Sequence, residues 1–184
     1  DEGSLTELAK MHISKPPIKI TADPVLAIHS VEKNIGQKIL SHNKVSHTKP
    51  IIGICAREWR DLKHYKQILA EVSDKITAEY DAQIVFIPMQ YPEDVKAAQK
   101  ISSLMHSKSI VLNDEYTTSE LLSITGNLDM LLSIRLHALI FAGVMGVPMI
   151  GLSYDPKVDR FLSSIDEKTV GNLENVTVDD ILNQ

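Results

Sequence analysis

Arg135 and His137 are the two residues of this sequence whose types and spacing point most directly to chemistry. They follow an apolar run, Met130 to Ile134, that is too short for a helix and is typical of a buried strand. Ala138 to Val144 fits a buried helix, so the two polar side chains lie at a strand-to-helix turn. The amino terminus of a helix presents unpaired N–H groups and a partial positive charge. We therefore expect a phosphate or a carboxylate to bind at this turn.

His137 is the candidate general acid. The start of the helix opposes a protonated imidazole, but a bound anion would favour it, and a general acid requires that protonated form. Leu136 is expected to point into the core, so that Arg135 and His137 share the other side. The structural alternative is that Arg135 pairs with a nearby carboxylate such as Asp129 while His137 caps the turn. The sequence pattern leaves both interpretations open.

A second polar cluster follows the next apolar run, Met149 to Leu152. Asp155 and Pro156 form a good N-cap and first-turn pair for a helix, and Lys157 lies in that first turn. If the two apolar runs are neighbouring parallel strands, both clusters lie at the carboxyl edge of one sheet, where open α/β folds bind ligands. Lys157 could then reach the same anion, and Tyr154 could line the pocket. The alternatives are a solvated lysine and a tyrosine that only covers the sheet edge.

Other strand ends contribute polar residues to the same edge. Arg57, with Trp59 and Arg60 close by, follows the first strand of a regular series, and two arginines beside an indole are uncommon as packing. The alternative is an exposed loop with an Arg57–Glu58 or Arg60–Asp61 ion pair, which would contribute little to stability. The ends of the next two strands add Gln90, Glu115 and Thr118.

Regular alternation of strand and helix patterns predicts the fold class. Further apolar runs of strand length lie at Ile51–Ala56, Ile84–Ile87 and Ile110–Leu112. Helical patterns run from Leu62 to Ile76, from Pro92 to Met105 and from Thr117 to Thr125. Strands that alternate with helices at this spacing form a parallel sheet with right-handed crossovers. We therefore expect an α/β fold, a Rossmann-like parallel sheet with helices on both faces.

Residues 1–49 are expected to form a linker segment that leads into a single domain spanning 1–184. A short helix ends near His12, Ile18–Ile20 is a candidate strand, and a weaker helix runs from Val31 to Leu40, interrupted by Gly36. A closing helix is expected after Thr177. The chain lacks an initiator methionine, as if it were cut from a longer protein, so we expect an upstream domain.

Composition argues against several function classes. With 184 residues, 43% hydrophobic and 23% charged, the chain is ordinary globular protein. The formal net charge of -5 and the scattered basic residues argue against a nucleic-acid surface. Cys55, the only cysteine, is expected to be buried in a protein of a reducing compartment. No HExxH, GxGxxG, GxxxxGK[ST] or serine-elbow motif occurs, so we expect no zinc, dinucleotide-fingerprint, P-loop or serine-nucleophile site.

A membrane span is not expected. The amino terminus is polar and acidic, unlike a signal peptide. Leu136 to Leu152 carries no Asp, Glu, Lys or Arg, but it is short and contains three glycines and Pro148. Two buried elements of a soluble fold explain this stretch better.

The motifs described so far resemble those of the polysaccharide pyruvyl transferases, and specifically the CsaB-type cell-wall enzymes. The resemblance rests on Arg135 to Ala142, Gly146 to Pro148 and Gly151 to Val158. Further support, spread over nearly the whole chain, comes from Asp1–Ser4, Thr21–Pro24 and Pro88–Pro92.

The resemblance implies a glycosyltransferase-B-like architecture of two Rossmann-like domains, of which this chain would be the carboxyl-terminal, donor-binding one. It implies that phosphoenolpyruvate is the donor substrate and that neither a cofactor nor a metal is needed. The acceptor would be N-acetylmannosamine in a lipid-linked wall-polymer precursor, held mostly by the amino-terminal domain. The product would be a 4,6-linked pyruvate ketal that anchors surface-layer proteins.

The candidate residues fit this chemistry, which needs a proton for the methylene carbon of the enol and cations for the donor's two anionic groups. His137 would be the acid, Arg135 and Lys157 would clamp the phosphate or the carboxylate, and Arg57 would be a second clamp. Tyr154, Gln90 and Glu115 complete the expected substrate-binding set.

Two other functions stay open. One is a nucleotide-sugar glycosyltransferase or epimerase domain, since the same architecture binds uridine diphosphate sugars at the same sheet edge. The other is a non-catalytic anion-binding module. We expect a cytoplasmic protein that works at the inner face of the membrane, because a lipid-linked acceptor requires that approach. No amphipathic basic helix is evident here, so the contact is expected elsewhere in the full protein.

Overall fold

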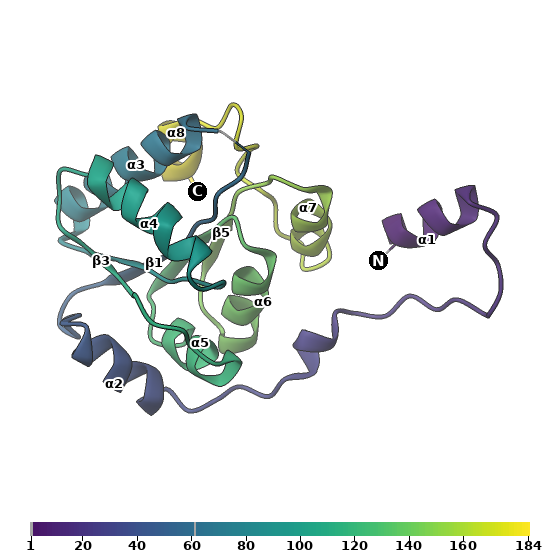
Figure 1. The fold of residues 1–184 in the computed structure, drawn as a ribbon, viewed down its shortest axis with the longest axis horizontal. Coiled ribbons are helices and arrows are strands. Elements are labelled where there is room, and N and C mark those ends of the chain that lie inside the picture. The colour runs from purple at the N-terminus through teal and green to yellow at the C-terminus, as the bar shows by residue number, and fades with distance from the viewer. Residues whose placement is uncertain (1, 61) are drawn as a thin grey trace.

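A five-stranded parallel sheet forms the centre of the protein (Figure 1). The computed structural model describes residues 2–60 and 62–184. The strands are β1 (Ile51–Cys55), β2 (Gln83–Phe86), β3 (Ser109–Val111), β4 (Met130–Ser133) and β5 (Met149–Gly151). Their spatial order is β3-β2-β1-β4-β5, and every neighbouring pair is parallel. Each strand lies within one residue of the run that predicts it, so the predicted sheet is confirmed.

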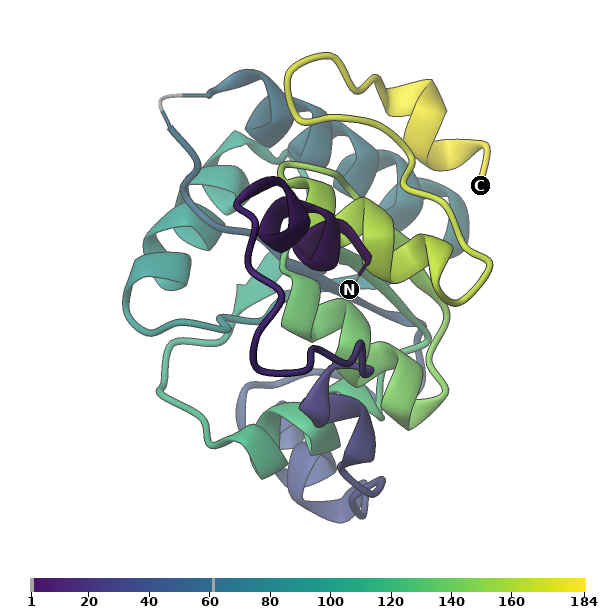
Figure 2. The same ribbon diagram turned by 90° about the vertical axis from the view of Figure 1, so that its right-hand side faces the viewer.

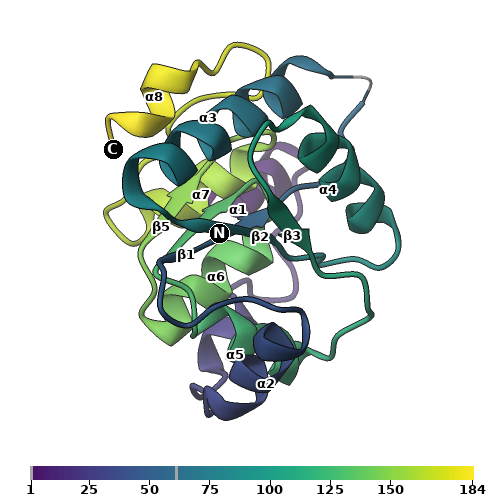
Figure 3. The same ribbon diagram turned by 90° about the vertical axis from the view of Figure 1, so that its left-hand side faces the viewer.

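Helices cover both faces of the sheet (Figure 3). One face packs against α3 (His64–Tyr80), α4 (Glu93–Leu104) and α8 (Val178–Leu182), which share a core cluster with Ile52, Ile84 and Leu132. The other face packs against α2 (Asn34–His42), α5 (Thr118–Thr125) and α6 (Leu136–Met145). Because β1 and β4 are buried along almost their whole length, their near-continuous apolar sequences are what a sheet covered on both sides requires.

The α7 helix (Pro156–Ser163) adds a small layer outside α6. Val158, Phe161 and Leu162 pack against Leu139 and Ile140 of α6. The side chain of Asp155 accepts the backbone N–H of Lys157 at 3.0 Å, and Pro156 occupies the first turn. The predicted cap of this helix is therefore confirmed.

The order of the strands reverses between β1 and β4. The crossovers through α3 and α4 lead outward from β1 to β2 and β3, whereas β4 and β5 lie on the other side of β1. Cys55 is the register partner of Ser133, so Arg57 and Arg135 each lie two residues beyond a paired position. Open α/β sheets bind ligands at such a switch point, outside the carboxyl ends of the strands.

Two local predictions are wrong. Ile18–Ile20 is not a strand but unpaired chain that carries two exposed isoleucines. Gly36 does not interrupt its helix, because α2 runs through it. A side-chain Cβ at Gly36 would lie 2.2 Å from the carbonyl oxygen of Ser123, and the Gly36 N–H donates to Ser123 Oγ at 2.7 Å. The glycine is there because α2 and α5 pack backbone to backbone.

Residues 2–33 run along the outside of the molecule (Figures 1 and 2). They contain α1 (Glu2–Lys10), which has no buried residue, and the short η1 (Pro24–Ala27). The Arg160 side chain on α7 contacts Gly3, which places α1 beside α7. No helix that the structure describes combines the length and the apolar character needed to cross a membrane.

Candidate functional site

Two arginines follow the strands that flank the switch point. Arg57 comes after β1 and Arg135 comes after β4, and both side chains are partly buried. In each guanidinium the Nε atom is buried and has no hydrogen-bond acceptor among residues 2–60 and 62–184. Both arginines therefore have hydrogen-bonding capacity that the described protein atoms do not use.

Arg57 lies between two aromatic rings. Its Nη1 donates to the Tyr154 hydroxyl at 3.3 Å, and its Cζ is 5.4 Å from the ring centroids of both Trp59 and Tyr154. The two rings meet edge to face, with centroids 4.7 Å apart and an interplanar angle of 67°. This contact joins the β1 end to the β5 end and brings Arg57 and Tyr154 together.

Two further cations complete what we call the cation–aromatic cluster, formed by Arg57, Trp59, Arg60, Tyr154 and Lys157. Arg60 Cζ lies 5.6 Å from the Trp59 centroid, and Lys157 Nζ lies 5.3 Å from the Tyr154 centroid. Among the described residues, Lys157 pairs only with Oδ2 of Asp155, at 3.9 Å in an exposed contact that contributes little to stability. Lys157 also lies in the first turn of α7, where the helix dipole disfavours a cation unless an anion accompanies it.

Glu58 anchors the segment after β1 that contributes Arg57, Trp59 and Arg60 to the cluster. It pairs with the buried Lys66 on α3 and, at 2.7 Å, with Lys100 on α4. Burial alone would raise the pKa of Glu58, but hydrogen bonds from Lys100 and Lys66 outweigh burial and hold that pKa below its ordinary value. The alternative Arg57–Glu58 pair is therefore wrong. The Arg60–Asp61 alternative lies outside the described residues.

Arg135 belongs to a second group with Asp94 and Gln90. Its Nη2 donates to Oδ1 of Asp94 and, at 3.2 Å, to Oε1 of Gln90. The predicted pairing of Arg135 with Asp129 is wrong. Asp129 lies at the opposite end of the sheet, where it accepts the backbone N–H of Ile51 at 2.7 Å. Arg135 thus does have a carboxylate partner, as the structural alternative holds, but that partner comes from α4.

His137 is exposed in the first turn of α6, two residues after Arg135. It does not cap the turn. The start of α6 has no side-chain cap among the described residues; the Ser133 hydroxyl instead holds the turn before it, accepting the Arg135 N–H at 2.8 Å and donating to the Arg135 carbonyl at 3.0 Å. Leu136 packs against the cluster that joins α6 and α7, as expected. No described residue makes a hydrogen bond with the His137 ring, so the ring is free to meet a ligand.

Glu115 is not brought to either group. It is exposed in the loop after β3, the edge strand, which β2 separates from β1. No hydrogen bond or ion pair among the described residues connects it to Arg57 or Arg135. Thr118 is the first residue of α5 and follows the same edge strand.

The sequence did not single out Asp94, which is 1% exposed. The available signal was an acidic residue in the first turn of a predicted helix that follows a strand end, a pattern that usually marks only a favourable helix dipole. Cys55 is 2% exposed and burial raises the pKa of its thiol, so the expected structural role fits its surroundings. No group of three or more His, Cys, Asp or Glu in the described part of the chain could hold a metal ion.

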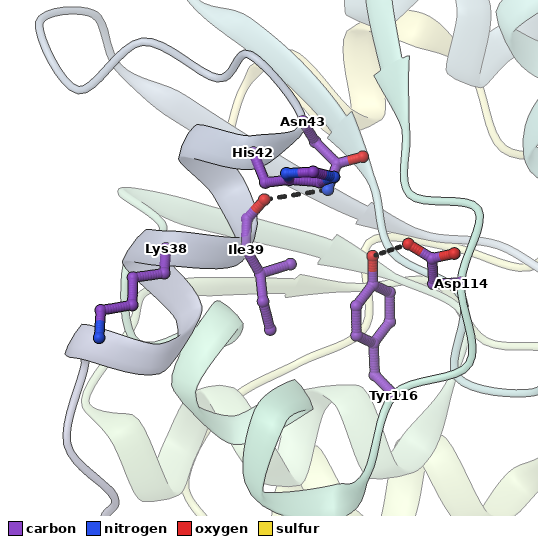
Figure 4. Close-up of a pocket in the computed structure, with 6 residues that line it drawn as sticks. All are labelled: Lys38, Ile39, His42, Asn43, Asp114 and Tyr116. Carbon is purple, nitrogen blue, oxygen red and sulfur yellow. Dashed lines mark hydrogen bonds between the residues drawn. The ribbon is translucent and has the colours of Figure 1, made fainter.

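A hollow of about 330 Å³ lies elsewhere, between the end of α2 and the loop that follows β3 (Figure 4). Tyr116 points its hydroxyl toward Asp114, 3.5 Å away, and burial together with Asp114 raises the Tyr116 pKa to about 12. Three of the side chains that line it are exposed and the other three are partly buried. Its lining residues are Lys38, Ile39, His42, Asn43, Asp114 and Tyr116, none of which the sequence patterns predict.

Comparison with known proteins gives one family match. The family model described as polysaccharide pyruvyl transferase matches residues 1–156. No curated protein matches the sequence significantly.

Solved structures share the fold at low sequence identity. S. aureus MnaA, solved with UDP, matches 99% of this chain and 48% of its own with a TM-score of 0.73 and 12% identity. E. coli ADP-heptose LPS heptosyltransferase II matches 83% of this chain and 50% of its own, with a TM-score of 0.65 and 14% identity. Methanocaldococcus jannaschii UDP-GlcNAc 2-epimerase, solved with UDP-GlcNAc and UDP, matches 99% of this chain and 52% of its own, with a TM-score of 0.63 and 16% identity. The chain therefore has the α/β fold of glycosyltransferase-B-type transferases and epimerases, and it spans about half the length of these neighbours.

Proposed function

Because the chain belongs to the polysaccharide pyruvyl transferase family, we propose that it binds phosphoenolpyruvate at the switch point between β1 and β4 and takes part in transferring the enolpyruvyl group to a sugar. The observation that carries this proposal is the cation–aromatic cluster. It places Arg57, Arg60 and Lys157 at the sheet edge where open α/β folds bind ligands. Their main partners are ring faces, so their charge is available to an anion.

Phosphoenolpyruvate suits this surface because it is small and carries a phosphate and a carboxylate. A guanidinium can bind either group through two parallel hydrogen bonds, and an ammonium can act as a compact charge. Arg57 and Lys157 both contact the Tyr154 ring, so a ligand beside that ring can approach either cation. The unpartnered Nε of Arg57 adds to this argument, because a buried N–H without an acceptor costs about 1–3 kcal/mol until an oxygen reaches it.

His137 is the proposed acid. Its proton would go to the methylene carbon of the enol, and the resulting cationic carbon would be attacked by one sugar hydroxyl, whose proton returns to the imidazole. The bond to phosphate would then break, and a second sugar hydroxyl would close the ketal while its proton leaves with the phosphate. The ring is exposed in the first turn of α6 and has no hydrogen-bond partner among the residues that the structure describes, which is compatible with both proton transfers.

For the acceptor, we propose N-acetylmannosamine in a lipid-linked cell-wall polymer precursor, converted to a 4,6-ketal of the kind made by CsaB-type enzymes. The support is the resemblance carried by Arg135–Ala142 and Gly151–Val158. On this proposal the chain is the donor-binding domain, and a second domain holds most of the acceptor at the inner face of the membrane. Surface-layer anchoring would be the use of the product.

A uridine nucleotide site is the second candidate, since two of the fold neighbours were solved with UDP. It would occupy the same sheet edge. The two candidates differ in their ligand, because a nucleotide adds a base and a ribose to the anionic groups. Direct comparison of ligands therefore separates them.

The test is a thermal-unfolding titration of this chain with phosphoenolpyruvate, inorganic phosphate and uridine diphosphate N-acetylglucosamine. Ligand at a hundred times its dissociation constant adds about 2.7 kcal/mol, which is on the order of 5 to 10 °C for a chain of this size. Lys157→Ala should lose much of the shift with phosphoenolpyruvate. Lys49→Ala is the matched control, because it removes an exposed lysine that pairs with Asp81 just before β1, at the opposite end of the sheet. A shift with the nucleotide sugar and none with phosphoenolpyruvate would overturn the proposal.

A further inference from the structure

Asp94 links two strand-end loops that contribute to the proposed site. We infer that it is a positioning residue, which fixes the Arg135 guanidinium and the Gln90 amide in one arrangement across the end of β1. The inference deepens the proposed function and rests on it. Asp94 itself is buried and is not expected to touch the donor.

Every contact of the Asp94 carboxylate is directed at these loops. Its Oδ2 accepts the backbone N–H groups of Met89 at 3.1 Å and of Gln90 at 2.9 Å, which fixes the course of the loop after β2. Its Oδ1 accepts Nη2 of Arg135, which comes from the end of β4. A carboxylate that is 1% exposed is stable only when such partners compensate its charge, so the arrangement is strongly constrained.

The ion pair between Asp94 and Arg135 reaches across the end of strand β1. β2 and β4 both flank β1, so the contact between Asp94 and Arg135 crosses the carboxyl end of β1, just beyond Cys55. Arg57 leaves β1 at the same edge. Asp94 therefore sets the position of Arg135 relative to the residue that holds the cation–aromatic cluster together.

Asp94 also decides what Arg135 and Gln90 can offer a ligand. It balances the charge of Arg135, so Arg135 contributes directed N–H groups more than net charge. Gln90 Oε1 accepts Nη2 of Arg135 at 3.2 Å, which leaves the Gln90 Nε2 amide as a donor with no partner among the described residues. Both side chains thus present donors in a fixed geometry, which favours a ligand of matching shape over a free phosphate ion.

Asp94→Asn tests this. The amide keeps the size of the side chain, but it replaces one acceptor oxygen with a donor and removes the charge, so Arg135 or the loop N–H groups lose their partner. The dissociation constant of phosphoenolpyruvate should rise by about tenfold, which is within the coupling seen between neighbouring residues. The dissociation constant of inorganic phosphate should change much less, so selectivity falls.

Asp74→Asn is the matched control. Asp74, on α3, also accepts two backbone N–H groups, from His106 at 2.9 Å and Ser107 at 2.8 Å, but these donors lie in the loop before β3, away from the site. It should lower the stability of the chain without altering the ratio of the two dissociation constants. Arg135→Lys is a second, milder variant, because it retains the charge beside Asp94 but not the planar fork, and it should reduce selectivity as Asp94→Asn does.

A second readout does not depend on the donor. In ¹⁵N–¹H spectra of the unliganded chain, the Arg135 Nε–H and Gln90 amide signals should move in Asp94→Asn and stay in place in Asp74→Asn. Unmoved signals in Asp94→Asn, or an unchanged ratio of dissociation constants for phosphoenolpyruvate and phosphate, would overturn the inference. Failure of the wild-type chain to bind phosphoenolpyruvate, with the signals moving as expected, would instead overturn the proposed function and leave Asp94 as the residue that positions Arg135.

Discussion

Replacing Arg57 with alanine should separate ligand affinity from protein stability. In the folded chain, Arg57 has two ring contacts at 5.4 Å and a hydrogen bond to Tyr154. The ring contacts stabilise by about 0.5–1 kcal/mol each, and the long hydrogen bond adds roughly 0.5 kcal/mol. Against this, the buried Nε without an acceptor costs about 1–3 kcal/mol, and that cost disappears with the side chain. The two terms nearly cancel, so the melting temperature should change by less than about 4 °C.

The affinity of the same variant for phosphoenolpyruvate should fall much more. A hydrogen bond between a guanidinium and an anion contributes about 1.5–3 kcal/mol, which corresponds to about a 10- to 150-fold rise in the dissociation constant. Isothermal titration calorimetry measures the affinity, and thermal unfolding without ligand measures the stability. Arg57→Lys should fall between wild type and Arg57→Ala, since it retains the charge without the planar fork.

Two results would refute this reasoning. An unchanged dissociation constant for phosphoenolpyruvate in Arg57→Ala would show that the ring-bound arginine is not a donor ligand. A fall of more than about 8 °C in the melting temperature would show that Arg57 is chiefly part of the folded framework, so that any loss of binding is secondary. Lys49→Ala again serves as the control for the removal of one positive charge.

Three further predictions concern catalysis, pH and packing. In whole enzyme supplied with the sugar acceptor, His137→Ala should reduce the rate of phosphate release by about 10²- to 10⁴-fold with little change in phosphoenolpyruvate affinity, and wild-type turnover would exclude His137 as the acid. Burial would raise the pKa of Asp74, but hydrogen bonds from Ser107 and His106 hold it well below its usual range. The contribution of Asp74 to folding stability should therefore be complete above the pKa of an unfolded aspartate, about 3.9, and should be lost as the pH falls. Between pH 6 and pH 3, the urea midpoint of Asp74→Asn should therefore drop less than that of the wild type. Gly36→Ala should lower the free energy of unfolding by about 1–3 kcal/mol through overlap with Ser123. Gly143→Ala is the control and should be tolerated, because its Cβ would meet only Met149 Cε at 3.5 Å. Equal melting temperatures for the two variants would contradict the packing argument.

The sheet could be predicted because its signals are local. Each buried strand is a short apolar run, and glycine or proline residues mark the boundaries of the elements. Gly146, for example, has a φ of 68° and closes α6 in the left-handed conformation that favours glycine, and Pro148 directly precedes β5. The switch point then followed from strand order, which places the polar turns after β1 and β4 at one edge.

The partners of the site residues could not be predicted, because they depend on contacts between distant segments. Arg135 and Asp94 are 41 residues apart, and nothing in either segment alone favours Asp94 over the nearer Asp129. The prediction that Gly36 interrupts its helix was wrong for the same reason. The contact of Gly36 with Ser123 spans 87 residues, so the sequence pattern does not show that this glycine is needed for close packing. Ile18–Ile20 has strand-like residues, but none of the strands that the structure describes pairs with them.

Charge balance suggests why an anion should bind here in a chain of net charge -5. Arg135 is matched by Asp94, and Lys66 and Lys100 are matched by Glu58. In the described chain the cation–aromatic cluster has no such match beyond the weak contact of Lys157 with Asp155. Aromatic rings can stabilise cations without neutralising them, since they offer a quadrupole and no net charge. An incoming anion that carries a phosphate and a carboxylate would therefore meet cations that are already held in place but whose charge is not yet compensated, and this favours binding.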